Sequence, residues 1–128
     1  GRKAIIVDDE IDTAGTLMEV TRALEREGVD EIYACATHGV LSGPAVQRID
    51  ESSLAEVVIT DTIPMPPEKR LAKIRQLSVA PLIGEAIRRI HEAESVGALF
   101  SSEIQLVQEM GLWSDRDEQA SHVDEGAA

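Results

Sequence analysis

Short apolar runs alternate with amphipathic stretches along most of the chain. Residues 4–7 form a continuous apolar run, which is typical of a strand buried on both faces of a parallel sheet. Polar residues follow, and apolar residues then recur at helical spacing from Leu17 to Leu24 until Gly28 provides a stop. Residues 31–36 predict the next strand. This order of strand, loop, helix and strand is the minimal βαβ unit.

The same alternation continues through the middle of the chain. Ser42 and Pro44 predict a short helix over 45–49, with the serine as cap and the proline just inside. Residues 56–60 and 74–79 predict two further strands, separated by prolines that exclude regular structure. Pro81 opens an amphipathic helix that reaches Ile90. The pattern therefore predicts an α/β fold with a parallel sheet.

The pattern weakens beyond Phe100. Residues 104–110 predict one last helix, and residues 114–128, with five acidic residues against one arginine, predict a disordered tail. We therefore divide the chain into a domain at 1–100 and an extension at 101–128. The chain has no initial Met and enters a strand almost at once, so we expect it to be part of a longer protein.

Composition narrows the class of protein. The chain has 128 residues, 43% of them apolar, and a net charge of −12 from 12 basic and 24 acidic residues. This balance argues against nucleic-acid binding, which needs a basic face. No apolar run approaches the length of a membrane span, and a lone Cys35 fits a reducing compartment. We expect a cytoplasmic protein with neither a nucleic acid nor a membrane as partner.

The candidate chemistry lies in residues 5–16. Thr13, Ala14, Gly15 and Thr16 form a small-residue turn at the start of a helix, where backbone N–H groups and two hydroxyls can bind a phosphate. The turn lacks the lysine of a Walker loop, which argues against a nucleotide triphosphatase of that type.

Asp8 and Asp9 precede this turn, and Asp12 lies between them and Thr13. Two carboxylates beside a phosphate repel it unless sugar hydroxyls or Mg²⁺ lie between them. A phosphorylated five-carbon sugar meets both demands in one molecule. The alternative is that these aspartates only cap the helix and keep the loop solvated.

This stretch, Val7-Asp8-Asp9 followed by Asp12-Thr13-Ala14-Gly15-Thr16, resembles the signature of the type I phosphoribosyltransferase family. Further blocks are similar to the ribose-phosphate pyrophosphokinases of that fold, at 32–39, 41–45, 60–64, 86–91 and 95–100. The resemblance implies a Rossmann-like parallel sheet, incomplete in this chain. It also implies a Mg²⁺-dependent transfer of pyrophosphate from ATP to ribose 5-phosphate, which yields phosphoribosyl pyrophosphate (PRPP) and AMP.

The resemblance also implies roles for particular residues. The loop from Asp12 to Thr16 would hold the 5-phosphate, and Asp8 and Asp9 would bind the ribose hydroxyls and meet Mg²⁺ through water. The family's catalytic lysine-arginine loop and most of its ATP site precede this strand, so no catalytic residue falls in this chain and we expect no turnover from it alone. The family's hexamers imply a homo-oligomer.

Other residues carry weaker signals. Ser95 and Phe100 resemble the family's regulatory phosphate and ADP pocket, although Gly97 stands where a serine is common. His38 is expected to be a hydrogen-bonded loop residue. Asp61 and Thr62 either border the substrate or a nucleotide, or belong to a plain turn. Two other functions stay open: a non-catalytic regulatory relative of the pyrophosphokinases, and a transferase that consumes PRPP.

Overall fold

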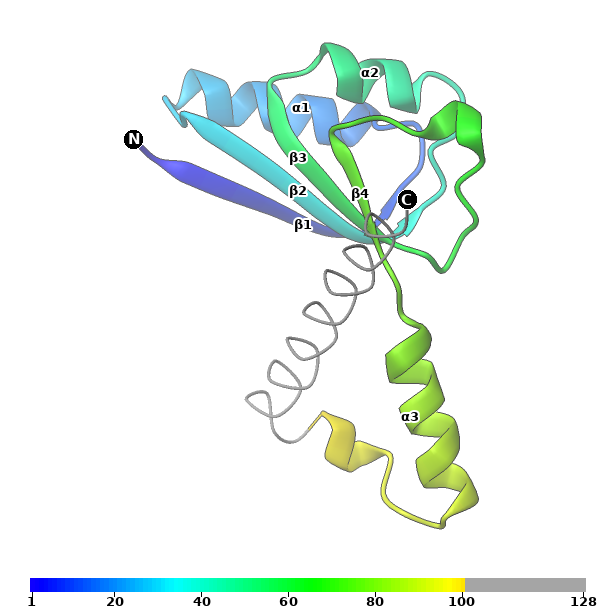
Figure 1. Cartoon of the computed structure of the whole chain (residues 1–128). Coiled ribbons are helices and arrows are strands. Elements are labelled where there is room, and N and C mark those ends of the chain that lie inside the picture. The colour runs from blue at the N-terminus through cyan, green and yellow to red at the C-terminus, as the bar shows by residue number, and fades with distance from the viewer. Residues whose placement is uncertain (101–128) are drawn as a thin grey trace, which may run out of the picture. The chain divides into compact units, whose positions relative to one another are not determined.

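The computed structural model describes residues 1–100, which fall into a unit at Gly1–Ala80 and a second unit that begins at Pro81 (Figure 1). The expected helix at 104–110, the expected tail at 114–128 and the rest of the extension lie outside the described residues. None of the helices within 1–100 has the length and apolar character needed to cross a membrane.

The first unit is built on a parallel sheet whose strands follow one another in chain order. Its strands are β1 (Lys3–Ile11), β2 (Glu31–Gly39), β3 (Leu54–Thr60) and β4 (Ile74–Leu77). Two helices, α1 (Gly15–Arg26) and α2 (Ala45–Glu51), join the first three strands, and a short helix, η1 (Pro67–Lys69), precedes β4. The predicted α/β class and the four predicted strands are confirmed.

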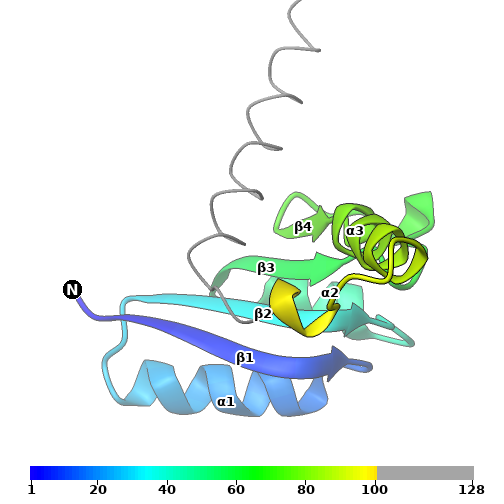
Figure 2. The same ribbon diagram turned by 90° about the horizontal axis from the view of Figure 1, so that it is seen from below.

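Both helices cover the same face of the sheet (Figure 2). Between them and the strands lies an aliphatic core, in which Ile49, Leu54 and Val57 are completely or almost completely buried. The predicted burial of the first strand on both faces is wrong, because Ile5 and Val7 are 68% and 76% exposed. Their side chains lie on the face that neither α1 nor α2 covers.

The first strand is also longer than its apolar run. Backbone pairing continues beyond Val7, where Asp8 lies opposite Ala36 and Glu10 opposite His38. Asp8, Asp9 and Glu10, which we placed in a loop, are therefore part of the strand, whereas Asp12 lies after its end. A strand end that is open to solvent can carry carboxylates without a desolvation cost, so the ladder does not stop where the hydrophobicity does.

The end of α1 follows the prediction from Gly28. Gly28 adopts a positive φ of 73°, and its N–H donates to the Glu25 carbonyl, while the N–H of Val29 donates to that of Leu24. This pair of bonds is the Schellman arrangement, in which a glycine takes the left-handed position that ends a helix.

The second unit contains α3 (Ala80–His91) and a short helix, η2 (Gly97–Leu99). The helix predicted to open at Pro81 is therefore confirmed. Glu85 forms ion pairs with Arg88 and Arg89, each 2.8 Å long. Hydrogen bonds from these two guanidinium groups lower the pKa of Glu85 to about 2.

Candidate functional site

The loop between β1 and α1 has a backbone suited to binding an anion. Ala14 adopts the left-handed conformation, with φ 61° and ψ 16°, and Gly15 begins the helix directly after it. A left-handed residue beside a helical one directs successive N–H groups into one concavity. No side chain caps this helix, and its first turn holds no acidic residue. The N–H groups that a helix leaves unpaired at its start are thus available to a ligand.

The two threonines of the loop add hydroxyl donors. Thr13 and Thr16 are exposed, and neither side chain has a hydrogen-bond partner within residues 1–100. The absence of internal partners distinguishes them from Thr21, whose hydroxyl donates to the Leu17 carbonyl. The loop therefore offers uncommitted donors from both its backbone and its side chains.

Residues that follow β2 hold this loop in place. The N–H groups of Val40 and Leu41 donate to the Ile11 carbonyl at 3.0 and 3.1 Å. The N–H of Ser42 donates to the Asp12 carbonyl at 3.0 Å, and its hydroxyl donates to the Asp12 carboxylate.

These contacts correct one prediction. We expected Ser42 to cap the following helix, but that helix has Pro44 at its N-cap and no capping side chain. The serine hydroxyl instead bonds the loop, because the chain turns back toward Asp12 before α2 begins.

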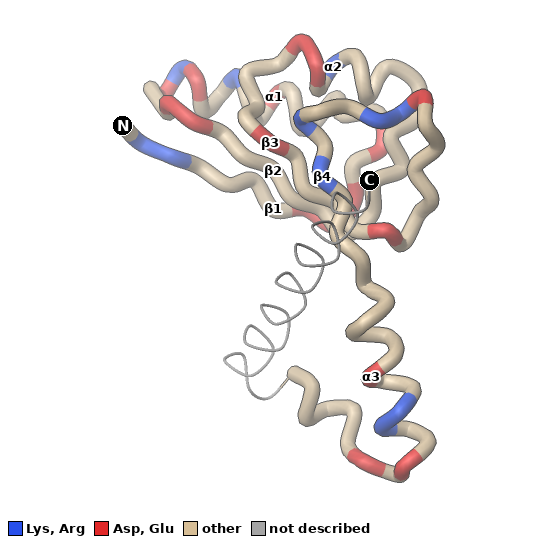
Figure 3. Tube along the Cα trace, viewed as in Figure 1, with Lys and Arg blue, Asp and Glu red and all other residues tan. Residues whose placement is uncertain are grey.

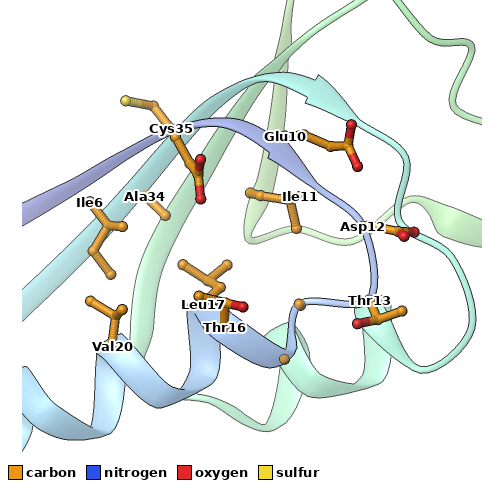
Figure 4. Close-up of a pocket in the computed structure, with 13 residues that line it drawn as sticks. Ile6, Glu10, Ile11, Asp12, Thr13, Thr16, Leu17, Val20, Ala34 and Cys35 are labelled. Atoms are coloured by element: carbon orange, nitrogen blue, oxygen red, sulfur yellow. The ribbon is translucent and has the colours of Figure 1, made fainter.

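A cavity of about 200 Å³ lies against this loop, between β1 and α1 (Figure 4). Ile6 and Val20 point toward one another at one side of it, and Asp12 and Thr13 lie at the other (Figure 4). Its polar lining comes from Asp8, Glu10, Asp12, Thr13 and Thr16. The remaining lining residues are Ile6, Ile11, Ala14, Gly15, Leu17, Val20, Ala34 and Cys35.

The structure separates the two adjacent aspartates. Side chains alternate between the faces of a strand, so Asp8 lies on the face of Ile6 and α1, whereas Asp9 lies on the face of Val7. Asp8 lines the cavity and Asp9 does not. Of the seven residues predicted to bind ribose 5-phosphate, six line one cavity and Asp9 faces the other side of the sheet.

The other polar residues at this edge of the sheet have structural partners. Nδ1 of His38 lies 2.8 Å from the Thr62 hydroxyl, so the expected hydrogen bond is present, although His38 belongs to β2 and not to a loop. The Asp61 carboxylate accepts the N–H of Val79 at 2.8 Å. This bond, together with one from the Ser78 hydroxyl, lowers the pKa of Asp61. Asp61 thereby ties the end of β3 to the segment after β4.

Charge is unevenly distributed over the first unit. Acidic residues gather at the carboxyl end of β1. Basic residues gather over the end of η1, the turn after it and β4, at Lys69, Arg70, Lys73 and Arg75 (Figure 3). No group of three His, Cys, Asp or Glu side chains within residues 1–100 is arranged to hold a metal ion.

The residues predicted to line a regulatory pocket belong to the second unit. Ser95 is exposed, and its carbonyl accepts a hydrogen bond from Arg89 at 3.2 Å. Phe100 is 66% exposed. The described residues of this unit thus leave both side chains accessible.

Arg48 is the site residue that the sequence did not predict. It lies on α2, and its Nη1 donates to the Thr13 carbonyl at 2.9 Å. No local pattern could reveal this bond, because the two residues are 35 positions apart. Their proximity arises only when the crossover helix after β2 packs beside the loop after β1.

Comparison with known proteins covers most of the described chain. Residues 1–101 match the family described as the phosphoribosyl synthetase-associated domain. A ribose-phosphate pyrophosphokinase of Caldanaerobacter subterraneus is 64% identical over 101 residues, which are 79% of this chain and 32% of that protein. The enzyme of the same name from Bacillus subtilis is 54% identical over 101 residues, again 79% of this chain and 32% of the relative.

A solved structure agrees with these sequence matches. The phosphoribosylpyrophosphate synthetase of Mycobacterium smegmatis superposes with a TM-score of 0.71 and 41% identity, over 73% of this chain and 31% of that one. The chain thus spans about a third of the length of the relatives that it matches. The match to the family model extends over the whole first unit, and the chain belongs to the phosphoribosyl synthetase-associated domain family.

Proposed function

We propose that this chain is the ribose 5-phosphate-binding part of a ribose-phosphate pyrophosphokinase. One observation carries the proposal: an uncapped helix start and a left-handed Ala14 share one cavity with the Asp8 carboxylate. The N–H groups suit the 5-phosphate, and the carboxylate suits the hydroxyls of the sugar. The names of the relatives in this family support the same substrate.

Gly15 adds support, because nothing within residues 1–100 requires a glycine there. A Cβ at this position would lie 3.6 Å from Nη1 of Arg48 and 3.7 Å from Oγ1 of Thr13, which are ordinary contacts. A glycine is also a poor choice for helix stability. The close approach of a ligand to the backbone would explain a glycine at this position, whereas packing does not.

The reaction that we propose for the complete enzyme moves a pyrophosphoryl group from ATP to the 1-hydroxyl of ribose 5-phosphate. Such transfers depend on positioning and charge neutralisation more than on covalent chemistry. The loop contributes positioning, since it fixes the phosphate end of the acceptor. We assign no residue of this chain to ATP or to catalysis, and we expect the chain alone to bind ribose 5-phosphate without releasing AMP.

Mg²⁺ is part of this proposal, as an ion held partly by the substrate. Proteins hold Mg²⁺ through one or two carboxylates together with phosphates and waters, and the cavity offers carboxylates without a complete metal cage. Asp8 would hold the ion, directly or through water, because Asp9 faces away from the cavity. The bound ion would offset phosphate charge beside Glu10 and Asp12.

Calorimetric titration with ribose 5-phosphate, with and without Mg²⁺, tests the proposal. Thr16→Ala removes a hydroxyl donor to the phosphate, and Asp12→Ala removes the carboxylate through which Ser42 holds the loop, so each should weaken binding about tenfold or more. Thr16→Ser, which keeps the hydroxyl, and Asp50→Ala, which removes an exposed carboxylate on α2, should bind as the unmodified chain does. Unchanged affinity in both alanine variants would contradict the assignment, as would equal binding of unphosphorylated ribose.

A further inference from the structure

We infer that Arg48 is a positioning residue for the phosphate loop, which it holds through the peptide bond between Thr13 and Ala14. Its role in ligand binding rests on the function proposed above, whereas its effect on the loop does not. The Arg48 guanidinium donates to the Thr13 carbonyl at 2.9 Å. Among residues 1–100, it is the basic side chain that makes a hydrogen bond to the loop at 12–16.

The bonded carbonyl controls the direction of the next N–H. In a trans peptide the carbonyl and the following N–H point in opposite directions, and no peptide in the described chain is cis. A bond that fixes the Thr13 carbonyl on the side of α2 therefore turns the Ala14 N–H to the opposite side. That N–H is the first of the donors that the concave loop offers.

The loop needs such a restraint because its backbone is strained. A left-handed conformation is unfavourable for a residue with a side chain, and Ala14 has a φ of 61°. It persists only where the surrounding structure determines it. Ala14 is 4% exposed, its carbonyl accepts the N–H of Met18 at 3.1 Å, and Arg48 holds the peptide before it. Ser42 adds a second tie through both the carbonyl and the carboxylate of Asp12.

Charge gives the same arginine a second effect. Asp8, Glu10 and Asp12 line the cavity, and together they oppose the entry of a phosphate. Nη1 of Arg48 lies 3.6 Å from the position of a Cβ on Gly15, so a guanidinium charge lies beside the loop. Arginine stays ionised at any physiological pH. The loop is thus formed before a ligand binds, and the Arg48 guanidinium places one fixed positive charge beside it.

Hydrogen exchange and calorimetry on the full chain test this inference with Arg48→Met, which keeps the aliphatic stem but removes every donor. The amides of Met18 and Ser42 report the loop, since they donate to Ala14 and Asp12. We expect both to exchange about tenfold faster, and ribose 5-phosphate to bind about tenfold more weakly. Arg48→Lys should recover part of both effects.

The controls separate a local effect from a general one. Gln47→Met alters the neighbouring exposed residue of α2, and the Val57 amide, which donates to the Lys73 carbonyl, reports the sheet. The exchange of the Met18 and Ser42 amides should be unchanged in Gln47→Met, and the exchange of the Val57 amide should be unchanged in Arg48→Met. Unchanged exchange at Met18 and Ser42 in Arg48→Met would overturn the inference, even if affinity fell. If the unmodified chain does not bind ribose 5-phosphate, the proposed function fails, and the exchange data alone decide whether Arg48 positions the loop.

Discussion

Replacing Gly15 with alanine should separate the stability of the chain from its affinity for a phosphate. The residue has helical backbone geometry, and a Cβ there would make contacts of 3.6 Å or longer. Alanine is more favourable than glycine in a helix by up to about 1 kcal/mol. At the first helical position we expect a smaller gain, so the free energy of unfolding should stay level or rise slightly.

The affinity of Gly15→Ala for ribose 5-phosphate should fall. The added methyl group would be attached to the Cα beside the N–H of residue 15 and would lie 3.7 Å from Oγ1 of Thr13, next to groups that we expect to bind the phosphate. A phosphate oxygen needs to come within about 2.9 Å of its N–H donors, and the methyl group keeps it farther away. The loss of one charge-assisted hydrogen bond costs about 1.5–3 kcal/mol, which weakens binding about 10- to 150-fold.

Urea unfolding and calorimetric titration with ribose 5-phosphate on the same samples provide both readings. Gly84→Ala is the matched control, because Gly84 lies inside α3 and a Cβ there would meet no atom within 4 Å. It should stabilise the chain without changing affinity. If Gly15→Ala binds ribose 5-phosphate as tightly as the unmodified chain does, the phosphate does not approach this backbone, and our argument from the glycine is refuted.

Two further predictions concern stability. Gly39→Ala places a Cβ 2.4 Å from Cδ1 of the buried Ile59, so urea unfolding should show a loss of about 1–3 kcal/mol; an unchanged midpoint would contradict this close packing. The pKa of Glu85 is lowered from 4.5 to about 2, chiefly by hydrogen bonds from Arg88 and Arg89. The ionised carboxylate therefore stabilises α3 above pH 4.5 and loses that contribution as the pH falls toward 2. The difference in helicity between the unmodified chain and Glu85→Gln should shrink over that range, and also in about 1 M salt.

The order of the secondary structure could be read from the sequence because each element leaves a local signal. Gly28 ends α1 through its positive φ, as its position after the last apolar residue of the helix predicts. The end of β1 was harder to predict from the sequence. Hydrophobicity stops at Val7, but backbone pairing depends on the neighbouring strand and continues to Ile11.

The exposure of Ile5 and Val7 could not be predicted from the same run of residues. An unbroken apolar strand predicts that both faces avoid water, but it does not say which segment covers each face. In the first unit, α1 and α2 lie on one face only (Figure 2). The pattern therefore gave the character of the strand correctly and the coverage of its second face incorrectly.

The candidate site shows a similar division. The composition of the loop could be recognised because small residues, hydroxyls and a helix start are adjacent in the sequence. The support of the loop could not, since Ser42 and Arg48 reach it from 30 and 35 positions away. The left-handed residue was hidden for another reason: a glycine stands next to it, yet Ala14 is the one with positive φ.

The separation of Asp8 and Asp9 follows from the extension of β1. Had the strand ended at Val7, both aspartates would have belonged to one loop and could have turned toward the same sugar. Because backbone pairing continues past them, alternation directs Asp8 toward α1 and Asp9 to the uncovered face. Only the first can meet a ligand in the cavity without breaking the ladder between β1 and β2. The hydrogen-bond register of the strand, rather than the identity of the two residues, thus decides which carboxylate lines the cavity beside the loop at 12–16.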